Sequence, residues 1–498
     1  MKSFISIFLV IVMLLSFVAC SGGTEDKKNP NVSKDTTSSN EPNKSDIVYE
    51  EDDLPDDLNF GGQVVNFLAQ NSADKNTEIC TEELNSDIVN DSVYNRERFI
   101  EDRLNIELEP ILVTFGDINI ELERQMASDE DMYQICAHAT SDFSKSVFKA
   151  YFYDLYELNY LNFDKPWWSQ TFNDESEILD SLYFTTGSLA LSLLRYTFAI
   201  FYNKTLAENN AEDIPELLDL YNMVESGDWT FDKLNQLSST IFIDNNGNDT
   251  PDEEDTYGIG MQRAIGVDTM WSSFDIDVLA PDGEGWFELV VSTEKLYSAM
   301  EMVNNLLYNN TGCYNSGTSD EDLDTLAAMF ASDNLLFMNN SLDAIETATL
   351  RNMQSDYGIL PFPKYDSKQD NYYSYSHDWY TTFAIPNTNR NPDVAAAVLE
   401  AMASYSYRDT VPAYLDTALK GKYMSDPQSR RMIDLVVEGF KVDASWIYLK
   451  TIGADFPTTF RRMLSDNKTN YSSEYATASR NVKMRLKAQK IDFEAKLG

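Results

Sequence analysis

A run of acidic and amide residues between Asp244 and Asp255 shows the sharpest ligand spacing in the chain. Counted from its first residue, side-chain oxygens fall at positions 1, 3, 5, 9 and 12, which are Asp244, Asn246, Asn248, Asp252 and Asp255. Position 7 is Thr250, which would offer a backbone carbonyl. Calcium takes about six to eight oxygen ligands, and a tight loop can present alternate residues inward. The spacing predicts a structural calcium site, and the alternative is a polar loop without metal.

Three positions of this loop depart from the usual calcium-binding pattern. Asn248 at position 5 removes one charge, and position 12 is Asp255 rather than Glu, as in dockerin-type loops. Asp249 stands at position 6, where Gly usually makes the turn. Because Asp adopts the left-handed backbone conformation more readily than most residues, the turn can still form. We therefore expect a weaker site than the standard loop provides.

The seven tryptophans are a second set of residues that could bind a ligand. Trp167, Trp271 and Trp379 lie in polar, loop-like stretches, whereas Trp229 stands at a predicted helix start and is expected to pack. A sugar ring packs its C–H face on an aromatic ring, while its hydroxyls need hydrogen-bond partners such as carboxylates and amides. The set predicts sugar-binding platforms, with core packing as the alternative for each residue.

Composition narrows the partners and the chemistry. The formal net charge is −44, so the surface repels phosphate backbones and nucleic acid is a poor partner. Neutral or cationic small molecules are favoured, although the charge also serves simply to keep a protein soluble. The chain has no serine-nucleophile elbow, no glycine-rich phosphate loop and no Cys-x-x-Cys pair. Carboxylate pairs are so frequent among 82 acidic residues that none identifies a glycosidase, which the sequence nevertheless leaves open.

Few residues are available for metal or redox chemistry. His138 and His377 are the only histidines, and we expect both to be structural. Cys80, Cys136 and Cys313 have no close spacing, so we expect small buried hydrophobic residues, with one disulfide among them as the alternative. No catalytic cofactor is predicted.

The N-terminal segment contains a short apolar run that is followed by a cysteine. Lys2 supplies a positive start, Phe4 to Val18 is apolar, and small residues lead to Cys20. This resembles the lipobox of bacterial lipoproteins, with Phe17 where that family prefers Leu. The resemblance implies a signal peptide at 1–19, lipid on the Cys20 sulfur and attachment at the extracellular face of the membrane. Residues 20–57 are polar and predict a disordered tether. An ordinary secretory signal is the alternative.

Strand and helix patterns alternate along the rest of the chain. Strands are predicted at 63–69, 106–113, 133–138 and 198–202. Helices are predicted after a cap at Asn90 or Asp91, at 118–126, after Thr230, at 294–307 and after Asn391, where Val394, Val398 and Met402 share the buried side. This alternation predicts an α/β fold with a largely parallel sheet.

Five segments, in order, resemble extracellular solute-binding proteins of the ABC sugar-transport class. They run through residues 62 to about 440 and are Phe201–Leu206 (FYNKTL), Asp219–Leu234, Asp244–Gly258, Met353–Tyr365 (MQSDYGILPFPKY) and Pro412–Lys422. The resemblance implies a two-lobed, type II periplasmic-binding-protein-like fold, with hinge-connected lobes around a ligand cleft. Lobe I would hold 58–187 and a segment after about 378. Lobe II would hold 190–376 and the C-terminal helices to 498.

The same resemblance suggests where the ligand binds. Chain crossings are expected near 186–191 and 377–382, and ligands bind between lobes in open α/β sheets. The candidate ligand-binding residues are Trp167 from lobe I, Trp271 and Trp446 from lobe II, and Arg195, Tyr196, Asp378 and Trp379 at the crossings.

The sequence therefore predicts a non-enzymatic, lipid-anchored substrate-binding protein of a bacterium. We expect a monomer that captures a carbohydrate, an oligosaccharide or a related neutral solute, for an ABC permease. A surface glycan-binding or sensory protein without a transporter is one alternative, and a secreted carbohydrate-active enzyme is another. Amino-acid, peptide and polyol ligands stay open.

Overall fold

The computed structural model of the chain describes residues 49–72, 78–420 and 427–497. The predicted signal peptide at 1–19, the predicted lipidation site Cys20 and most of the tether at 20–57 lie outside the described residues. Residues 50–498 form one compact unit. Within the part of the chain that the structure describes, no helix combines the length and the apolar character needed to cross a membrane.

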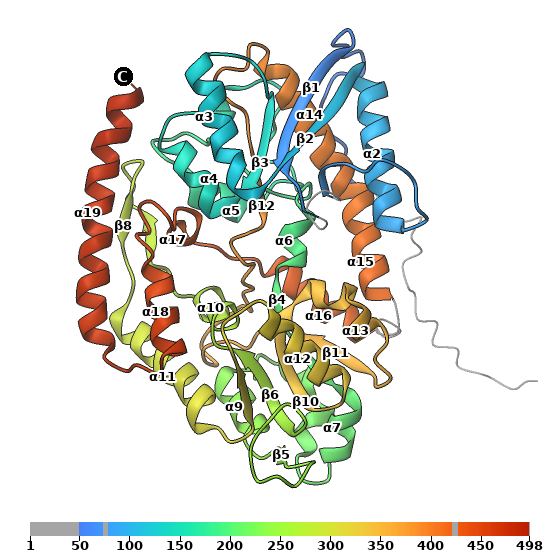
Figure 1. Cartoon of the computed structure of the whole chain (residues 1–498), viewed down its shortest axis with the longest axis vertical. Helices are drawn as coiled ribbons and strands as arrows, with labels where there is room; N and C mark the ends of the chain where they lie inside the picture. Colours follow the sequence, from blue (N-terminus) through green and yellow to red (C-terminus); the bar gives the residue numbers. More distant parts are fainter. Residues whose placement is uncertain (1–48, 73–77, 421–426, 498) are drawn as a thin grey trace, which may run out of the picture. The chain divides into compact units, whose positions relative to one another are not determined.

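The first sheet has the strand order β12-β3-β1-β2 (Figure 1). Its strands are β1 (Gln63–Gln70), β2 (Ile106–Val113), β3 (Ile135–Ala139) and β12 (Thr381–Ala384). β1 pairs in parallel with both β2 and β3, whereas β12 runs antiparallel to β3. The strands predicted at 63–69 and 106–113 are confirmed, and the third is confirmed with its start shifted to Ile135.

Five helices lie around this sheet and form lobe I with it. They are α2 (Ile88–Leu104), α3 (Ile118–Ser128), α4 (Thr140–Val147), α14 (Pro392–Tyr405) and α15 (Val411–Lys420). α2 begins earlier than predicted because Asp87 caps it, accepting hydrogen bonds from the backbone amides of Val89 and Asn90. The cap predicted at Asn90 or Asp91 is therefore wrong. The start of α14 after Asn391 is confirmed, with Val394, Val398 and Met402 buried.

The second sheet has the order β11-β4-β10-β6-β5, and β9 also pairs with β6. Its strands are β4 (Phe198–Asn203), β5 (Phe242–Ile243), β6 (Thr256–Gln262), β9 (Cys313–Ser316), β10 (Leu335–Ser341) and β11 (Tyr357–Leu360). β6 pairs in parallel with β9 and β10, but β4 is antiparallel to β10 and β11. The largely parallel arrangement predicted from the alternation is thus wrong for this sheet. The strand that follows each crossing, β4 or β12, enters its sheet in the opposite direction.

Helices also surround the second sheet and complete lobe II. They are α7 (Lys204–Asn210), α8 (Leu220–Glu225), α9 (Phe231–Ser238), α10 (Ile265–Ser273), α11 (Thr293–Asn309), α12 (Glu321–Ala331), α13 (Ala348–Arg351) and α16 (Pro427–Glu438). The predicted cap Thr230 is confirmed, since its side chain accepts a hydrogen bond from the backbone amide of Lys233. Such a cap stabilises a helix by about 1 kcal/mol.

The remaining elements lie outside these two groups. They are α5 (Gln170–Ser176), α6 (Leu191–Arg195), the hairpin β7 (Leu279–Pro281) and β8 (Phe287–Leu289), α17 (Ala444–Ile447), α18 (Phe456–Ser465) and α19 (Tyr471–Leu497). Short 3₁₀ turns lie at Phe115–Asp117, Leu155–Glu157, Pro215–Leu218 and Leu342–Glu346, and a π-helical turn lies at Ser406–Thr410.

The chain crosses between the two sheets twice. Thr185 bridges to β12 at Phe383, and Thr197, just before β4, bridges to Ser376. The first crossing therefore runs through α6, and the return runs from Ser376 into β12. The helices that follow β12 are shared between the lobes. α14 and α15 contact α2, α16 contacts β11, α17 contacts α4 and α5, and α18 contacts α10 and α11 (Figure 1). The prediction assigned the C-terminal helices to lobe II. Some of the helices after β12 also contact lobe I, because α14 and α15 pack on α2 and α17 packs on α4.

The end of the predicted tether is fixed to lobe I. Arg103 forms two hydrogen bonds with the carboxylate of Asp52, at 2.8 and 2.6 Å, and Lys165 pairs with Glu50 and Asp53. Leu54 is buried. The prediction that the tether extends to residue 57 is therefore wrong at its C-terminal end, because these ion pairs and this apolar contact order the segment.

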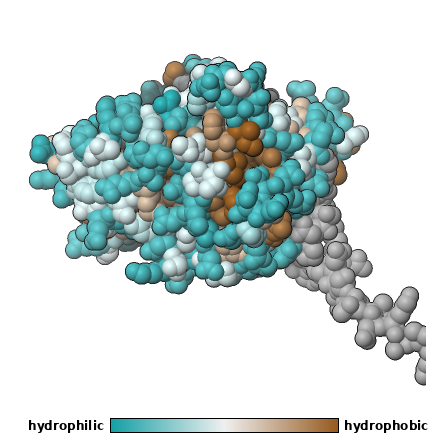
Figure 2. Space-filling view, turned by 90° about the horizontal axis from the view of Figure 1, so that it is seen from below, coloured by the Kyte–Doolittle hydropathy of each residue, from teal (hydrophilic) through white to brown (hydrophobic). Residues whose placement is uncertain are grey.

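Cys80, Cys136 and Cys313 are free cysteines. Cys136 is fully buried in β3, as expected for a small hydrophobic residue, and the other two are partly buried. The face of the molecule shown in Figure 2 is largely hydrophilic and is crossed by one apolar strip.

Candidate functional site

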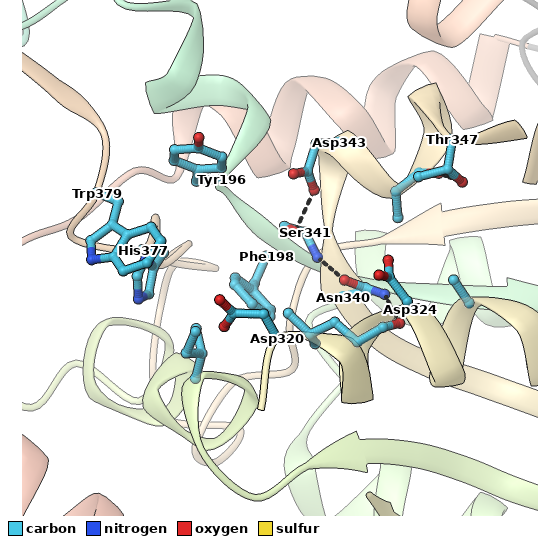
Figure 3. A pocket seen from close by; sticks show the side chains of 14 residues that line it. Tyr196, Phe198, Asp320, Asp324, Asn340, Ser341, Asp343, Thr347, His377 and Trp379 are labelled. Atoms are coloured by element: carbon cyan, nitrogen blue, oxygen red, sulfur yellow. Dashed lines mark hydrogen bonds between the residues drawn. The ribbon is translucent and has the colours of Figure 1, made fainter. Parts of the chain in front are cut away.

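A pocket of about 270 Å³ opens where the two crossings meet lobe II (Figure 3). Its lining comes from the end of α6 and the start of β4, the starts of α10 and α12, the end of β10 with the turn that follows it, and the return segment. The lining residues are Tyr196, Phe198, Ile265, Asp320, Leu323, Asp324, Ala327, Asn340, Ser341, Asp343, Ala344, Thr347, His377 and Trp379. Because β4 begins and β10 ends here, the pocket lies at the ends of two interior strands of the second sheet.

Aromatic side chains gather at one end of this pocket (Figure 3). Trp379 has 47 % of its surface exposed, a high value for a residue type that is mostly buried on average. Its ring contacts those of His377, at 5.2 Å between centroids, and Phe115, at 6.0 Å. Phe115 in turn contacts the buried His138 of lobe I at 4.8 Å. This chain of rings fixes the indole while leaving part of its surface open.

Polar side chains occupy the rest of the pocket. Asp320 and Asp324 lie one helical turn apart, Asp320 just before α12 and Asp324 in its first turn. Asn340 donates to the carbonyl of Leu323 at 3.2 Å and accepts from the backbone amide of Ser341 at 2.9 Å. The Ser341 hydroxyl donates to Asp343. The described lining contains no Lys or Arg, so the pocket offers mainly acceptors.

A buried polar cluster adjoins this pocket. Asp268 lies one turn along α10 from the lining residue Ile265, is fully buried and forms an ion pair with Arg461 of α18. The Arg461 guanidinium lies over the ring of Trp446 at 5.8 Å, and Trp446 contacts Tyr375 at 5.4 Å. Burial raises the pKa of Asp268 to about 7, although the adjacent guanidinium opposes this shift.

Several polar atoms of this cluster make no hydrogen bond within the described residues. They are Asp268 Oδ1, Tyr375 OH, Trp446 Nε1 and Arg461 Nε. A buried donor or acceptor without a partner is costly, roughly 1–3 kcal/mol each. None of these residues lines the pocket, so the cluster is a buried polar support behind the pocket.

The sequence-predicted residues at the crossings divide into two groups. Tyr196 and Trp379 line the pocket. Arg195 points elsewhere: its Nε binds Glu346 Oε1 at 3.0 Å, and its guanidinium lies 5.4 Å from the ring centroid of Tyr414. Asp378 is buried, with Oδ1 3.3 Å from Nε2 of His377, and does not line the pocket.

The three other predicted platforms pack in the core. Trp167 is fully buried, and Trp271 and Trp446 are 2 % and 3 % exposed. Trp271 contacts Phe456 and Phe460 of α18. A buried indole has no open face for a sugar, so these three predictions are corrected. Trp271 lies in α10 and Trp446 in α17, so polar sequence neighbours do not mark an exposed site at these positions.

Many polar groups of the predicted calcium loop form hydrogen bonds within the loop. Asp244 accepts from the backbone amides of Gly247, Asn248 and Asp249, and Asp252 accepts from the side-chain amides of Asn246 and Asn248. Asp255, fully buried, accepts from the backbone amides of Asn245 and Asp252, and the backbone amide of Thr250 donates to Asn248.

The predicted turn of this loop is confirmed. Asp249 has φ of 56°, the left-handed conformation expected at the position usually held by Gly. Within the described ranges, no group of three or more His, Cys, Asp and Glu side chains is arranged to hold a metal ion.

Sequence reasoning missed several residues of the pocket. His377, which the sequence analysis expects to be structural, lines the pocket beside Trp379. The signal available in the sequence was the next residue, Asp378, which is a predicted ligand-binding residue. Asp320, Asp324 and Asn340 gave none, because acidic and amide residues are frequent throughout the chain.

The arrangement can bind a neutral, hydroxylated molecule. The exposed part of Trp379 and the ring of Tyr196 offer apolar contact, and the carboxylates of Asp320 and Asp324 accept hydrogen bonds from hydroxyl groups. Hydrogen bonds to charged groups are about twice as strong as neutral ones. Nothing in this geometry requires a reaction at the site.

Solved structures of sugar-binding proteins are similar to this chain. The sugar-binding protein MalE from Xanthomonas citri superposes with a TM-score of 0.57 at 12 % identity, over 87 % of this chain and 99 % of that one. The GacH receptor of Streptomyces glaucescens GLA.O, solved unliganded and with acarbose, gives 0.54 at 13 % identity, over 86 % and 99 %. An ABC substrate-binding protein from Listeria monocytogenes, in complex with cycloalternan, gives 0.50 at 10 % identity, over 86 % and 98 %.

These likenesses define the fold. The chain has the two-lobed α/β fold of the ABC sugar-binding proteins, as predicted, and these neighbours are binding proteins rather than enzymes. No protein-family model matches the sequence, and no curated protein matches it.

Proposed function

We propose that this protein is an extracellular, lipid-anchored substrate-binding protein that captures a carbohydrate, most fittingly an oligosaccharide, for an ABC importer. The observation that carries the proposal is the pocket at the crossings, where the partly exposed Trp379 faces acidic and amide side chains. The fold supports it, because proteins of this fold bind acarbose and cycloalternan in the solved complexes. The protein would act as a monomer, close over its ligand and do no chemistry.

A sugar screen tests the proposal. Thermal unfolding of the protein, from residue 50 onward, is measured with mono- and oligosaccharides, and each stabilising sugar is titrated by calorimetry. A ligand at about 100 times its Kd stabilises the folded state by roughly 2.7 kcal/mol. We expect saturable, one-to-one binding with the sugar recovered unchanged. Turnover of the sugar would indicate a carbohydrate-active enzyme instead, and binding of amino acids or peptides alone would overturn the carbohydrate assignment.

The anchor and the transporter need separate tests. The Cys20 lipobox supports attachment to the membrane, and its Cys20→Ser variant should move the protein from the membrane fraction to the medium. Loss of sugar uptake on deletion of a neighbouring permease gene would support an importer. Unchanged uptake would favour a surface glycan-binding or sensory protein.

We also propose a structural calcium ion in the 244–255 loop. The spacing of Asp244, Asn246, Asn248, Asp252 and Asp255 supports it, as does the approach of both Asn amides to Asp252. Rotation of those amides would present oxygens in place of nitrogens. Calcium should raise the melting temperature of the wild type but not that of Asp252→Ala. Equal melting temperatures of the wild type in calcium and in chelator would overturn this proposal.

A further inference from the structure

Glu78 is a buried carboxylate where the two crossings meet. It has no exposed surface, a position in which a carboxylate is strongly unfavourable unless it is hydrogen-bonded and compensated. Its Oε2 accepts a hydrogen bond from the backbone amide of Ser192 at 2.7 Å, and its Oε1 accepts one from the Thr381 hydroxyl. Ser192 belongs to α6 on the first crossing, and Thr381 opens β12 on the return. One side chain of lobe I is thus bonded to both crossings.

The crossings are also bonded to each other around this carboxylate. The backbone amide of Thr381 donates to Ser192 Oγ at 2.9 Å, and the Thr186 hydroxyl donates to the Thr381 carbonyl at 2.7 Å. Further along, the backbone amide of His377 donates to the carbonyl of Tyr196 at 3.0 Å. His377 and Tyr196 both line the pocket. The hydrogen-bonded network therefore extends from Glu78 to the pocket wall.

Arg96 holds the backbone beside Glu78 and supplies a compensating charge. Its guanidinium is fully buried and donates to the carbonyls of Glu78, at 2.7 Å, and Ile79, at 2.9 Å. It also donates to the Ser406 hydroxyl at 2.9 Å. Burial lowers the pKa of Arg96 to about 10, which leaves it positively charged at neutral pH. The carboxylate is therefore buried in a hydrogen-bonded site with an opposite charge nearby.

We propose that Glu78 is a positioning residue for the pocket. Its carboxylate holds the two crossings in a fixed position relative to each other. It thereby sets the position of Tyr196 relative to His377 and Trp379, which also line the pocket. Glu78 does not line the pocket, so it acts through the segments that do. The role of the pocket rests on the proposed function, but the bonding of the crossings to Glu78 does not.

Hydrogen exchange of the ligand-free protein tests this role. Glu78→Gln keeps the shape of the side chain but replaces one acceptor oxygen with an amide NH2 group. This donor then faces the donor of either Ser192 or Thr381. Amides in 192–197 and 376–382 should exchange about tenfold faster, the effect of losing one hydrogen bond to a charged group. Glu400→Gln is the matched control. Glu400 is equally buried, but it accepts from Trp168 Nε1 at 2.9 Å and from the Asn162 amide at 3.2 Å.

The control separates local positioning from general stability. Glu400→Gln should lower the melting temperature while leaving the exchange of both crossings unchanged. Wild-type exchange of the crossings in Glu78→Gln, or an equal increase in Glu400→Gln, would overturn the proposal. Because no ligand is used, failure here is distinct from failure of the sugar screen.

A second pair of variants keeps the test decisive if Glu78→Gln does not fold. Thr381→Val removes the hydroxyl that donates to Glu78, and Thr381→Ser retains it. We expect faster exchange of the crossings with Val and near-wild-type exchange with Ser. Equal exchange in the two variants would contradict the role of the carboxylate.

Discussion

The pocket at the crossings and the 244–255 loop are both rich in carboxylates and amides, yet they use them differently. The polar side chains of the loop come from one short stretch of sequence. The Asp244 carboxylate accepts hydrogen bonds from the backbone amides of Gly247, Asn248 and Asp249. The pocket combines side chains from distant parts of the chain and directs Asp320 and Asp324 toward a cavity. Polar residues that are close in sequence form hydrogen bonds with one another's side chains and backbone. A cavity that stays open for a ligand the size of a sugar needs a scaffold that holds separate segments apart.

The largest expected effect in the pocket comes from Trp379. Trp379→Ala should weaken binding of the best sugar from the screen by roughly thirtyfold, which is about 2 kcal/mol for an aromatic contact of this kind. Its melting temperature should change little, because almost half of the side chain is already exposed. Calorimetric titration and thermal unfolding measure the two effects.

Phe99→Ala is the control for Trp379→Ala. Phe99 is 44 % exposed, comparable to Trp379, but it lies on α2 and does not line the pocket. Sugar binding should be unchanged in this variant. Wild-type affinity in Trp379→Ala would place the ligand outside the pocket and remove the contrast with the loop.

The carboxylates of the pocket should contribute the next largest effect. Asp320→Asn and Asp324→Asn should each weaken sugar binding by roughly tenfold, because a hydrogen bond from a hydroxyl to a charged acceptor is lost. Glu321→Gln, on the same helix but outside the lining, removes the same charge and should leave the affinity unchanged. Similar losses in all three variants would indicate a long-range effect of charge rather than direct contact.

Asp244 tests the opposite expectation for the loop. Asp244→Ala leaves three backbone amides without their acceptor and should lower the free energy of unfolding by about 1 kcal/mol, with no change in sugar binding. Asp228→Ala is the control, since that exposed carboxylate accepts from the Ser226 hydroxyl. Denaturant unfolding measures both variants. Weaker sugar binding in Asp244→Ala would show that the loop and the pocket are coupled.

The smallest effect is the pH dependence of the loop. Hydrogen bonds from the side chains of Asn248 and Asn246, and then from the backbone of Glu254, lower the pKa of Asp252. A lowered pKa stabilises the folded state above the usual pKa of Asp, and this contribution is lost as the pH falls through the folded value. The difference in melting temperature between wild type and Asp252→Ala should therefore shrink from about pH 5 to about pH 3. A constant difference would contradict it.

The sequence by itself determined the elements whose signals are local. Apolar periodicity placed β1 and β2, and Thr230 marked the start of α9, because a strand alternation or a cap depends on neighbouring residues. The tolerance of Asp249 for a left-handed turn was also readable. The order of the five family-like segments was enough to predict the two-lobed fold.

Only the tertiary structure decided which residues reach the pocket. Trp271 and Trp379 both stand in polar stretches of the sequence, but packing against α18 buries the first and the return crossing exposes the second. The directions of β4 and β12, and the meeting of Glu78 with Ser192 and Thr381, depend in the same way on segments far apart in the chain. Burial is a property of the packed molecule, so local spacing could not assign it.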